Sequence, residues 1–398
     1  MTSRENLLNV LNFDKSRRNL KWDFGYWGGT INRWQEEGLP KNLKFLGPKR
    51  ELIYGEFING PGIPYPMPSY SDDVLFASGI SEYFNLDKGT SPFLFNWWYY
   101  PRFEVEVINE TDEKIEFIDT LGIRRLDFKD ERSMPQWLEY PLKNEKDWER
   151  LKEERLNLNQ FERRYAVEDI DTYVSETEER DFALLLYGSP IGFFGILRFM
   201  IGEPTIYYWY YDKPEIMKSM ADYLCKMWLH IAEELTSKID FDYCYFFEDM
   251  AYKHGSLIGP AIFREFMAPY YKRLIDFARS RGVRHHIVDS DGYVEGLIPL
   301  FLEVGMTGIQ PFEVRAGNDI ERVRKNYPEF EILGGIDKTA LQSIQTIDLE
   351  LQKVERMLQK GGYVPYVDHA FPPDISFENY KYFREKLNAL VDPDLPQG

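Results

Sequence analysis

Short apolar runs alternate with longer segments of helical length through the second half of the chain. The runs are FALLLYG at 182–188, FDYCYFFED at 241–249, RHHIVDSDG at 284–292, TGIQPFEV at 307–314, FEILGGID at 330–337 and YVPYVDH at 363–369. Repeated strand–helix units whose strands are apolar throughout are typical of parallel strands that are buried on both faces. The pattern therefore predicts an α/β protein with a parallel sheet.

The segment 212–238 shows the helical signals in detail. Asp212, followed three residues later by Glu215, predicts a capping box at the start of this helix. Apolar side chains then recur on one face at spacings of four and three; they are Ile216, Met220, Tyr223, Met227 and Ile231.

The first 175 residues are less regular. The pattern predicts a helix over 1–12 and a strand followed by a turn over 20–29. Period-two alternation in FEVEVIN, KIEFIDT and IRRLDF, between residues 103 and 128, predicts a β-hairpin or meander. The segment 145–156 is polar and predicts an exposed helix.

Polar residues stand where nearly every apolar run ends. They are Glu248 and Asp249, Asp289 and Asp291, Glu313, Asp337 and Lys338, and Asp368 and His369. A (β/α)₈ TIM barrel builds its active site from the carboxyl ends of successive strands, whereas an open doubly wound sheet binds ligands only at a switch point. We therefore expect a single barrel domain over 1–398. Residues 1–175 would supply the early strands with a helical and hairpin extension, and 176–398 would supply the regular units.

Composition narrows the class of protein. The net charge of −18 disfavours a nucleic-acid ligand, and no basic stripe interleaved with aromatic residues is present. The two cysteines, Cys225 and Cys244, have no disulfide or zinc-finger spacing. There is neither an apolar signal-peptide core nor an apolar window long enough for a membrane span. We expect a cytoplasmic enzyme, a monomer or homodimer, with a small-molecule substrate.

The acidic strand ends are the main candidates for chemistry. Asp289 and Asp291 are two residues apart, so a strand would point both to one side, and close carboxylates favour a bound cation or a retained proton. With Glu313 and His369 they would make an oxygen-rich metal site for zinc, iron or manganese. A metal-free site is the alternative, and Asp291 has a second interpretation as the cap of the next helix. His285 and His286 lie inside a predicted strand, where packing explains a histidine equally well.

Two further stretches add candidates. FFEDMAYKHGS places Glu248 and Asp249 at a strand end and Lys253 in the loop; Glu248 is a candidate acid, and Asp249 and Lys253 are candidate substrate ligands, although a structural salt bridge would also explain them. Aromatic side chains in the first predicted strand and beyond would wall a pocket for a flat, apolar ligand; the pocket candidates are Asp23, Tyr26, Trp27 and Trp34.

GGIDKTAL (334–341), VDHAFPPDISFENY (367–380), EDMAYKHGSLIGPAIFREF (248–266) and the opening MTSRENLLNVLN resemble the uroporphyrinogen decarboxylase (URO-D) superfamily, which also contains corrinoid-linked methyltransferases. The resemblance implies a TIM barrel with its site at the strand carboxyl ends. The decarboxylase's Arg-rich opening motif is replaced here by KWDFGYWGG. The resemblance also matches Asp289, Asp291 and His369 to the zinc ligands of the thiol methyltransferases, with oxygen and nitrogen donors in place of sulfur.

RWQEEGLP (33–40) and the whole pattern most resemble barrels found beside corrinoid proteins in O-demethylase systems. The resemblance implies a methyltransferase that moves a methyl group from a small methoxyaromatic-type donor to a corrinoid on a partner protein. Zinc or another divalent metal at Asp289, Asp291, Glu313 and His369 would activate the leaving oxygen. Asp289, His369 and Glu248 are the catalytic candidates. Decarboxylation of uroporphyrinogen and non-catalytic tetrapyrrole binding are the alternatives.

Overall fold

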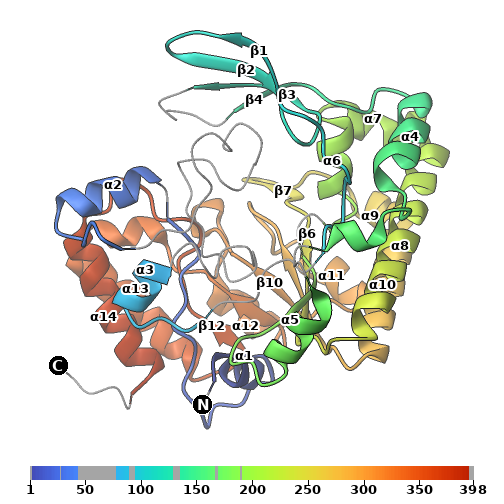
Figure 1. Ribbon diagram of the computed structural model, residues 1–398. Coiled ribbons are helices and arrows are strands. Elements are labelled where there is room, and N and C mark those ends of the chain that lie inside the picture. Colours follow the sequence, from blue (N-terminus) through green and yellow to red (C-terminus); the bar gives the residue numbers. More distant parts are fainter. Residues whose placement is uncertain are drawn as a thin grey trace.

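The computed structural model describes residues 2–26, 28–43, 78–88, 95–128, 135–165, 169–188 and 191–393. Its centre is a six-stranded sheet in which all neighbouring strands are parallel. In spatial order the strands are β12 (Tyr363–Val364), β11 (Glu331–Leu333), β10 (Gly308–Gln310), β9 (His285–Asp289), β6 (Tyr243–Phe247) and β5 (Leu185–Tyr187). Figure 1 shows these strands in the middle of the molecule, between α8 and α10 on one side and α13 and α14 on the other. The predicted parallel α/β class is confirmed.

The register places the strand ends at one level. Asp289, the last residue of β9, pairs with Phe247 at the end of β6 and with Gln310 at the end of β10. Parallel bridges from Ile336 to Val367 and from Tyr26 to Phe371 continue the pairing beyond β11 and β12. The residues that follow β6, β9, β10 and β12 therefore emerge side by side.

Helices follow the strands as the pattern predicts. They are α6 (Gly195–Ile201), α7 (Thr205–Asp212), α8 (Pro214–Thr236), α9 (Pro260–Phe266), α10 (Ala268–Ser280), α11 (Ile298–Val304), α12 (Ile320–Asn326), α13 (Ile344–Leu358) and α14 (Phe377–Val391). The predicted capping box at Asp212 is wrong. Asp212 ends α7, and α8 begins at Pro214, whose fixed φ and missing N–H suit the first helical position.

The N-terminal part is confirmed in outline. Helix α1 (Ser3–Leu11) has a capping box formed by Thr2 and Glu5. The predicted meander is a four-stranded antiparallel sheet that lies at one end of the molecule in Figure 1. Its strands are β1 (Glu106–Glu110), β2 (Lys114–Ile118), β3 (Arg124–Phe128) and β4 (Gln136–Glu139).

Two local predictions differ from the structure. The segment before α2 (Gly28–Glu36) forms only the Tyr26 bridge instead of a full strand. The polar segment 145–156 is α4 (Glu145–Leu151) followed by a π-helical turn, and it buries Trp148, Leu151 and Leu156 instead of lying fully exposed. The short helices α3 (Ser78–Tyr83) and α5 (Ile170–Thr177) complete the N-terminal part. Among the described residues, no helix combines the length and apolar composition that crossing a bilayer requires.

Candidate active site

Asp291 and His369 face each other beyond the ends of β9 and β12. His369 Nε2 lies 3.6 Å from Asp291 Oδ2, and the side chains are 27% and 37% exposed, respectively. Both groups are therefore within reach of solvent and of a small ligand. The alternative in which Asp291 caps the next helix is wrong, because α11 begins seven residues later, after Leu297.

Gly292 makes the approach of these segments possible. Its φ is +81°, and a Cβ there would lie 2.7 Å from the backbone carbonyl of Ala251. A side chain at this position would be strained by the left-handed backbone and would also push the β9 turn away from β7 (Ala251–Tyr252). The glycine of the DSDG stretch thus holds Asp291 close to the turn that follows β6.

The electrostatics of the pair favour an imidazolium next to a carboxylate. Burial by itself would lower the pKa of His369, but the carboxylate of Asp291 outweighs it and raises that pKa. Burial would raise the pKa of Asp291, but the charge of His369 lowers it. The two shifts together favour a proton on His369 beside an ionised Asp291.

Asp289 lies deeper than Asp291. It is 5% exposed, and its Oδ2 accepts a hydrogen bond of 2.8 Å from Gln310 Nε2. Tyr366 donates to Gln310 Oε1 at 3.0 Å, so the amide nitrogen of Gln310 is directed toward Asp289. Burial, followed by the charge of Asp291, raises the pKa of Asp289 to about 7. Asp289 is therefore a buried acid that exchanges its proton near neutral pH.

Lys338 stands among the remaining carboxylates. Its Nζ lies 3.8 Å from Glu313 Oε1 and 3.7 Å from Asp368 Oδ1. Glu313 Oε2 also accepts the Gly292 N–H at 2.9 Å, and buried Asp368 accepts the Val314 N–H at 2.8 Å. These contacts join the loops after β9, β10, β11 and β12 around the Asp291–His369 pair.

The predicted metal ligands do not form a preassembled metal site. Among the described residues, no three His, Cys, Asp or Glu side chains are arranged to hold an ion. Asp289 is turned toward Gln310, and Glu313 is engaged by Gly292 and Lys338. The ammonium group of Lys338 already supplies a cation between two acids. This arrangement is suited to proton transfer.

Glu248 is directed at the start of α6. Its carboxylate is fully buried and accepts the N–H groups of Phe193, Phe194 and Gly195 at 2.8–2.9 Å, together with the hydroxyl of Tyr271. Burial raises its pKa to about 7 in spite of these donors. With both oxygens occupied by protein donors, Glu248 fixes α6 on the turn after β6.

Arg198 links α6 to Asp249, which follows β6 at the site. It lies on α6 and donates to the carboxylate of Asp249 and, at 2.9 Å, to the Asp249 carbonyl. Asp249 has a φ of +44°, a conformation that costs energy for any residue with a side chain. Burial raises the pKa of Asp249 and Arg198 opposes it. Lys253, the other ligand candidate of this loop, is exposed in the turn between β7 and β8 (Gly255–Ser256).

The aromatic candidates lie elsewhere. Asp23, Tyr26 and Trp34 are buried between the N-terminal segment and α14, and Trp27 lies outside the described residues. The ring that does contact His369 is that of Phe24, at a centroid distance of 5.1 Å. The sequence did not indicate Gln310, Tyr366 or Arg198 as site residues, and Phe24 was not among the candidates. Phe24 could have been included, because it follows the candidate Asp23 directly at the end of the predicted strand.

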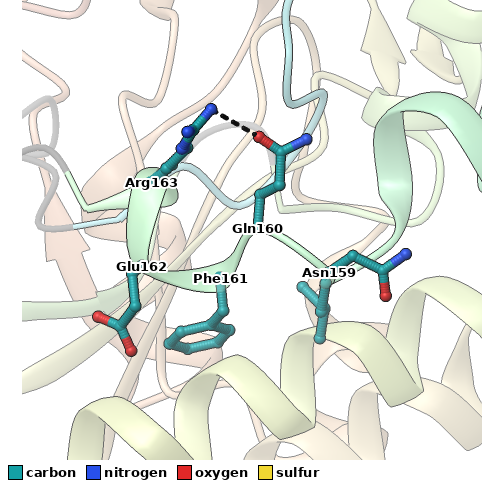
Figure 2. A pocket seen from close by; sticks show the side chains of 6 residues that line it. Asn159, Gln160, Phe161, Glu162 and Arg163 are labelled. Carbon is teal, nitrogen blue, oxygen red and sulfur yellow. Dashed lines mark hydrogen bonds between the residues drawn. The ribbon is translucent and has the colours of Figure 1, made fainter.

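A hollow lined by residues 158–163 is drawn in Figure 2. Its polar groups include Glu162 and the hydrogen-bonded pair Gln160 and Arg163, whose Oε1 and Nη1 atoms are 3.2 Å apart. None of the predicted site residues lines it. The chemistry described above therefore belongs to the strand ends and not to this hollow.

Comparisons with known proteins agree with the fold. The family model described as "Uroporphyrinogen decarboxylase (URO-D)" matches residues 117–390. A solved structure of a methyltransferase from Methanosarcina mazei superposes with a TM-score of 0.59 at 13% sequence identity, covering 98% of this chain and 100% of that one. At this identity the likeness concerns the fold alone. No curated protein matches the sequence.

Proposed function

Because the chain belongs to the uroporphyrinogen decarboxylase (URO-D) family, we propose that it is a methyltransferase. Its donor would be a small methylated compound of the methoxyaromatic type, and its acceptor a corrinoid carried by a partner protein. We also propose that the six parallel strands, together with the segment that Tyr26 bridges to Phe371, belong to a closed (β/α)₈ barrel. The fold likeness to a methyltransferase supports this branch of the family.

The Asp291–His369 pair is the observation that carries the proposal. Breaking the C–O bond of a methyl ether leaves its electron pair on oxygen, and that oxygen needs a proton to leave as a hydroxyl group. His369, protonated beside Asp291, is the partly exposed acid that can give it. The methyl group passes to the acceptor as the C–O bond breaks, so that an electron pair of the acceptor forms the new bond to carbon. Solvent then returns a proton to the imidazole.

The methyl acceptor and the residues around His369 have separate roles in the proposed reaction. A corrinoid brought by the partner protein would supply a nucleophilic cobalt centre. Within this chain, Phe24 gives the imidazole an apolar neighbour, and Asp289 is a second group able to exchange a proton near neutral pH. A divalent metal remains a prediction from the resemblance, and the mechanism proposed here does not use one.

The charge pattern favours methyl transfer over decarboxylation of uroporphyrinogen. That substrate carries eight carboxylates and needs cationic side chains free to bind them. The cations described around the site, Arg198 and Lys338, are already engaged with Asp249 and with Glu313 and Asp368. A small neutral donor avoids this competition.

The test is a direct assay on the purified protein. We expect incubation with 2-methoxyphenol, as a representative donor, and chemically reduced cobalamin to yield the demethylated phenol and methylcobalamin. His369→Gln should form both products about 10³-fold more slowly. A panel of methyl ethers and methylamines extends the donor class. Decarboxylation of uroporphyrinogen by the same preparation, or failure of the whole panel, would overturn the proposal.

A further inference from the structure

Asp23 is the centre of a fully buried polar cluster. Its Oδ2 accepts hydrogen bonds from the hydroxyls of Tyr26 at 2.5 Å and Tyr380 at 2.6 Å, and its Oδ1 accepts from Arg384 Nη1 at 2.9 Å. The side chains of Asp23 and Arg384 are 0% exposed. Arg384 also donates to the Trp22 carbonyl at 2.8 Å. Three donors from the protein thus occupy both oxygens of the Asp23 carboxylate.

The cluster joins distant parts of the chain. Tyr380 and Arg384 lie on α14, and Asp23 lies in the segment before α2. Trp34 stacks on Tyr380 with ring centroids 4.2 Å apart, and its Nε1 donates to the Ile375 carbonyl at 2.9 Å. These contacts fix the N-terminal segment on the C-terminal helix.

The same segment supports the loop that carries His369. Gly25 accepts the Phe371 N–H at 2.8 Å, Tyr26 stacks on the Phe371 ring at 5.3 Å, and Thr30 donates to the Phe371 carbonyl at 2.6 Å. Phe24, the neighbour of Asp23, lies against the His369 ring itself. A displacement of residues 23–26 would therefore move the imidazole relative to Asp291.

We propose that Asp23 and Arg384, with the Tyr26 and Tyr380 hydroxyls, are positioning residues that set Phe24 and the 369–371 loop and thereby aim His369 at Asp291. They act through Phe24 and Phe371 and do not touch the ligand. The inference rests on the proposed function only in giving His369 a reaction to serve.

The test follows the histidine ring signals by NMR in protein labelled with ¹⁵N-histidine. The chain has five histidines, so each signal can be assigned with a His→Gln variant. In Asp23→Asn we expect the His369 signal to move more than those of His230 and His254. Asp348→Asn is the matched control, because it removes a 2.8 Å bond from Tyr382, another α14 tyrosine, at an exposed position.

Each outcome decides the matter. An unchanged His369 signal in folded Asp23→Asn, or equal movement of all five signals, would overturn the positioning role. If Asp23→Asn does not fold, Tyr26→Phe carries the same comparison, since it removes one hydroxyl and keeps the ring on Phe371.

Kinetics with an accepted donor provide a second readout. Positioning predicts that kcat falls by about 10²-fold while KM stays nearly constant. A substrate ligand at Asp23 would instead raise KM and leave the His369 signal in place. Because the NMR measurement needs no donor, failure of the methyl-transfer assay and failure of this inference remain distinguishable.

Discussion

Two histidine–carboxylate pairs stand at opposite ends of the same parallel sheet. His285 and Glu331 open β9 and β11, whereas Asp291 and His369 lie beyond the ends of β9 and β12. In the first pair His285 Nδ1 is 2.6 Å from Glu331 Oε1, and Thr307 donates to Glu331 Oε2 at 2.7 Å. In the second the nitrogen and oxygen are 3.6 Å apart.

Exposure separates the two pairs further. His285 and Glu331 are 7% and 4% exposed, whereas the side chains of the other pair are about a third exposed. The buried pair, which we call the closed pair, has its hydrogen bonds made and holds β9 and β11 together. The partly exposed pair, which we call the open pair, is accessible enough to exchange a proton with a bound ligand. The same residue types thus form a closed structural pair at one end of the sheet and, at the other, the open pair to which the proposed chemistry is assigned.

The largest effect is expected from breaking the open pair. His369→Gln should lower methyl-transfer activity by about 10³-fold, because it removes the acid for the leaving oxygen, and should change the thermal midpoint little. Product formation and a melting curve check this. His230→Gln, at an exposed position of α8, is the control. Retention of full activity would remove His369 from the mechanism.

Breaking the closed pair of His285 and Glu331 should lower stability and not act on the proposed catalytic group. Glu331→Gln leaves His285 without its carboxylate partner in a buried place, so the free energy of unfolding should fall by about 2 kcal/mol. Urea denaturation measures it, with the exposed Glu329→Gln as the control. The comparison fails if Glu331→Gln is as stable as the control.

The dependence of stability and activity on pH gives a third and smaller test of the open pair. Because Asp291 raises the pKa of His369, the proton on His369 stabilises the folded state at low pH, and this contribution is lost as pH rises through that raised pKa. Activity should fall over the same range. Asp291→Asn removes the raising charge, so the fall should occur at lower pH, while Asp276→Asn on the exposed face of α10 should leave it in place. An unmoved profile in Asp291→Asn would contradict the pairing.

Much of the fold and part of the site followed from local sequence. Apolar runs located the six strands, and the polar residues at the ends of nearly all of these runs located the loops that meet. Both signals are properties of neighbouring residues. Asp291 and His369 came together for this reason. Asp212 failed as a cap because Pro214, two residues on, is the stronger signal for a first helical position.

The remaining site residues depended on partners far away in the chain. Nothing near Asp23 indicates that it meets Arg384, 361 positions later. Glu248 has the sequence context of a catalytic acid, but the N–H groups of Phe193–Gly195 and the hydroxyl of Tyr271 occupy its oxygens. In the sequence Arg198 has no feature that distinguishes it from other helical arginines. Its role depends on the packing of α6 against the turn after β6. Sequence patterns locate a strand end, and tertiary contacts decide whether the carboxylate there is free.

The ammonium group of Lys338, placed between Glu313 and Asp368, suggests a criterion for sorting related chains. A chain that keeps both acids and replaces this lysine by a short neutral residue would leave two unbalanced negative charges beside the histidine. Such a gap would attract a divalent ion. The identity of one residue after β11 would then decide whether a chain of this family binds a metal ion beside this histidine.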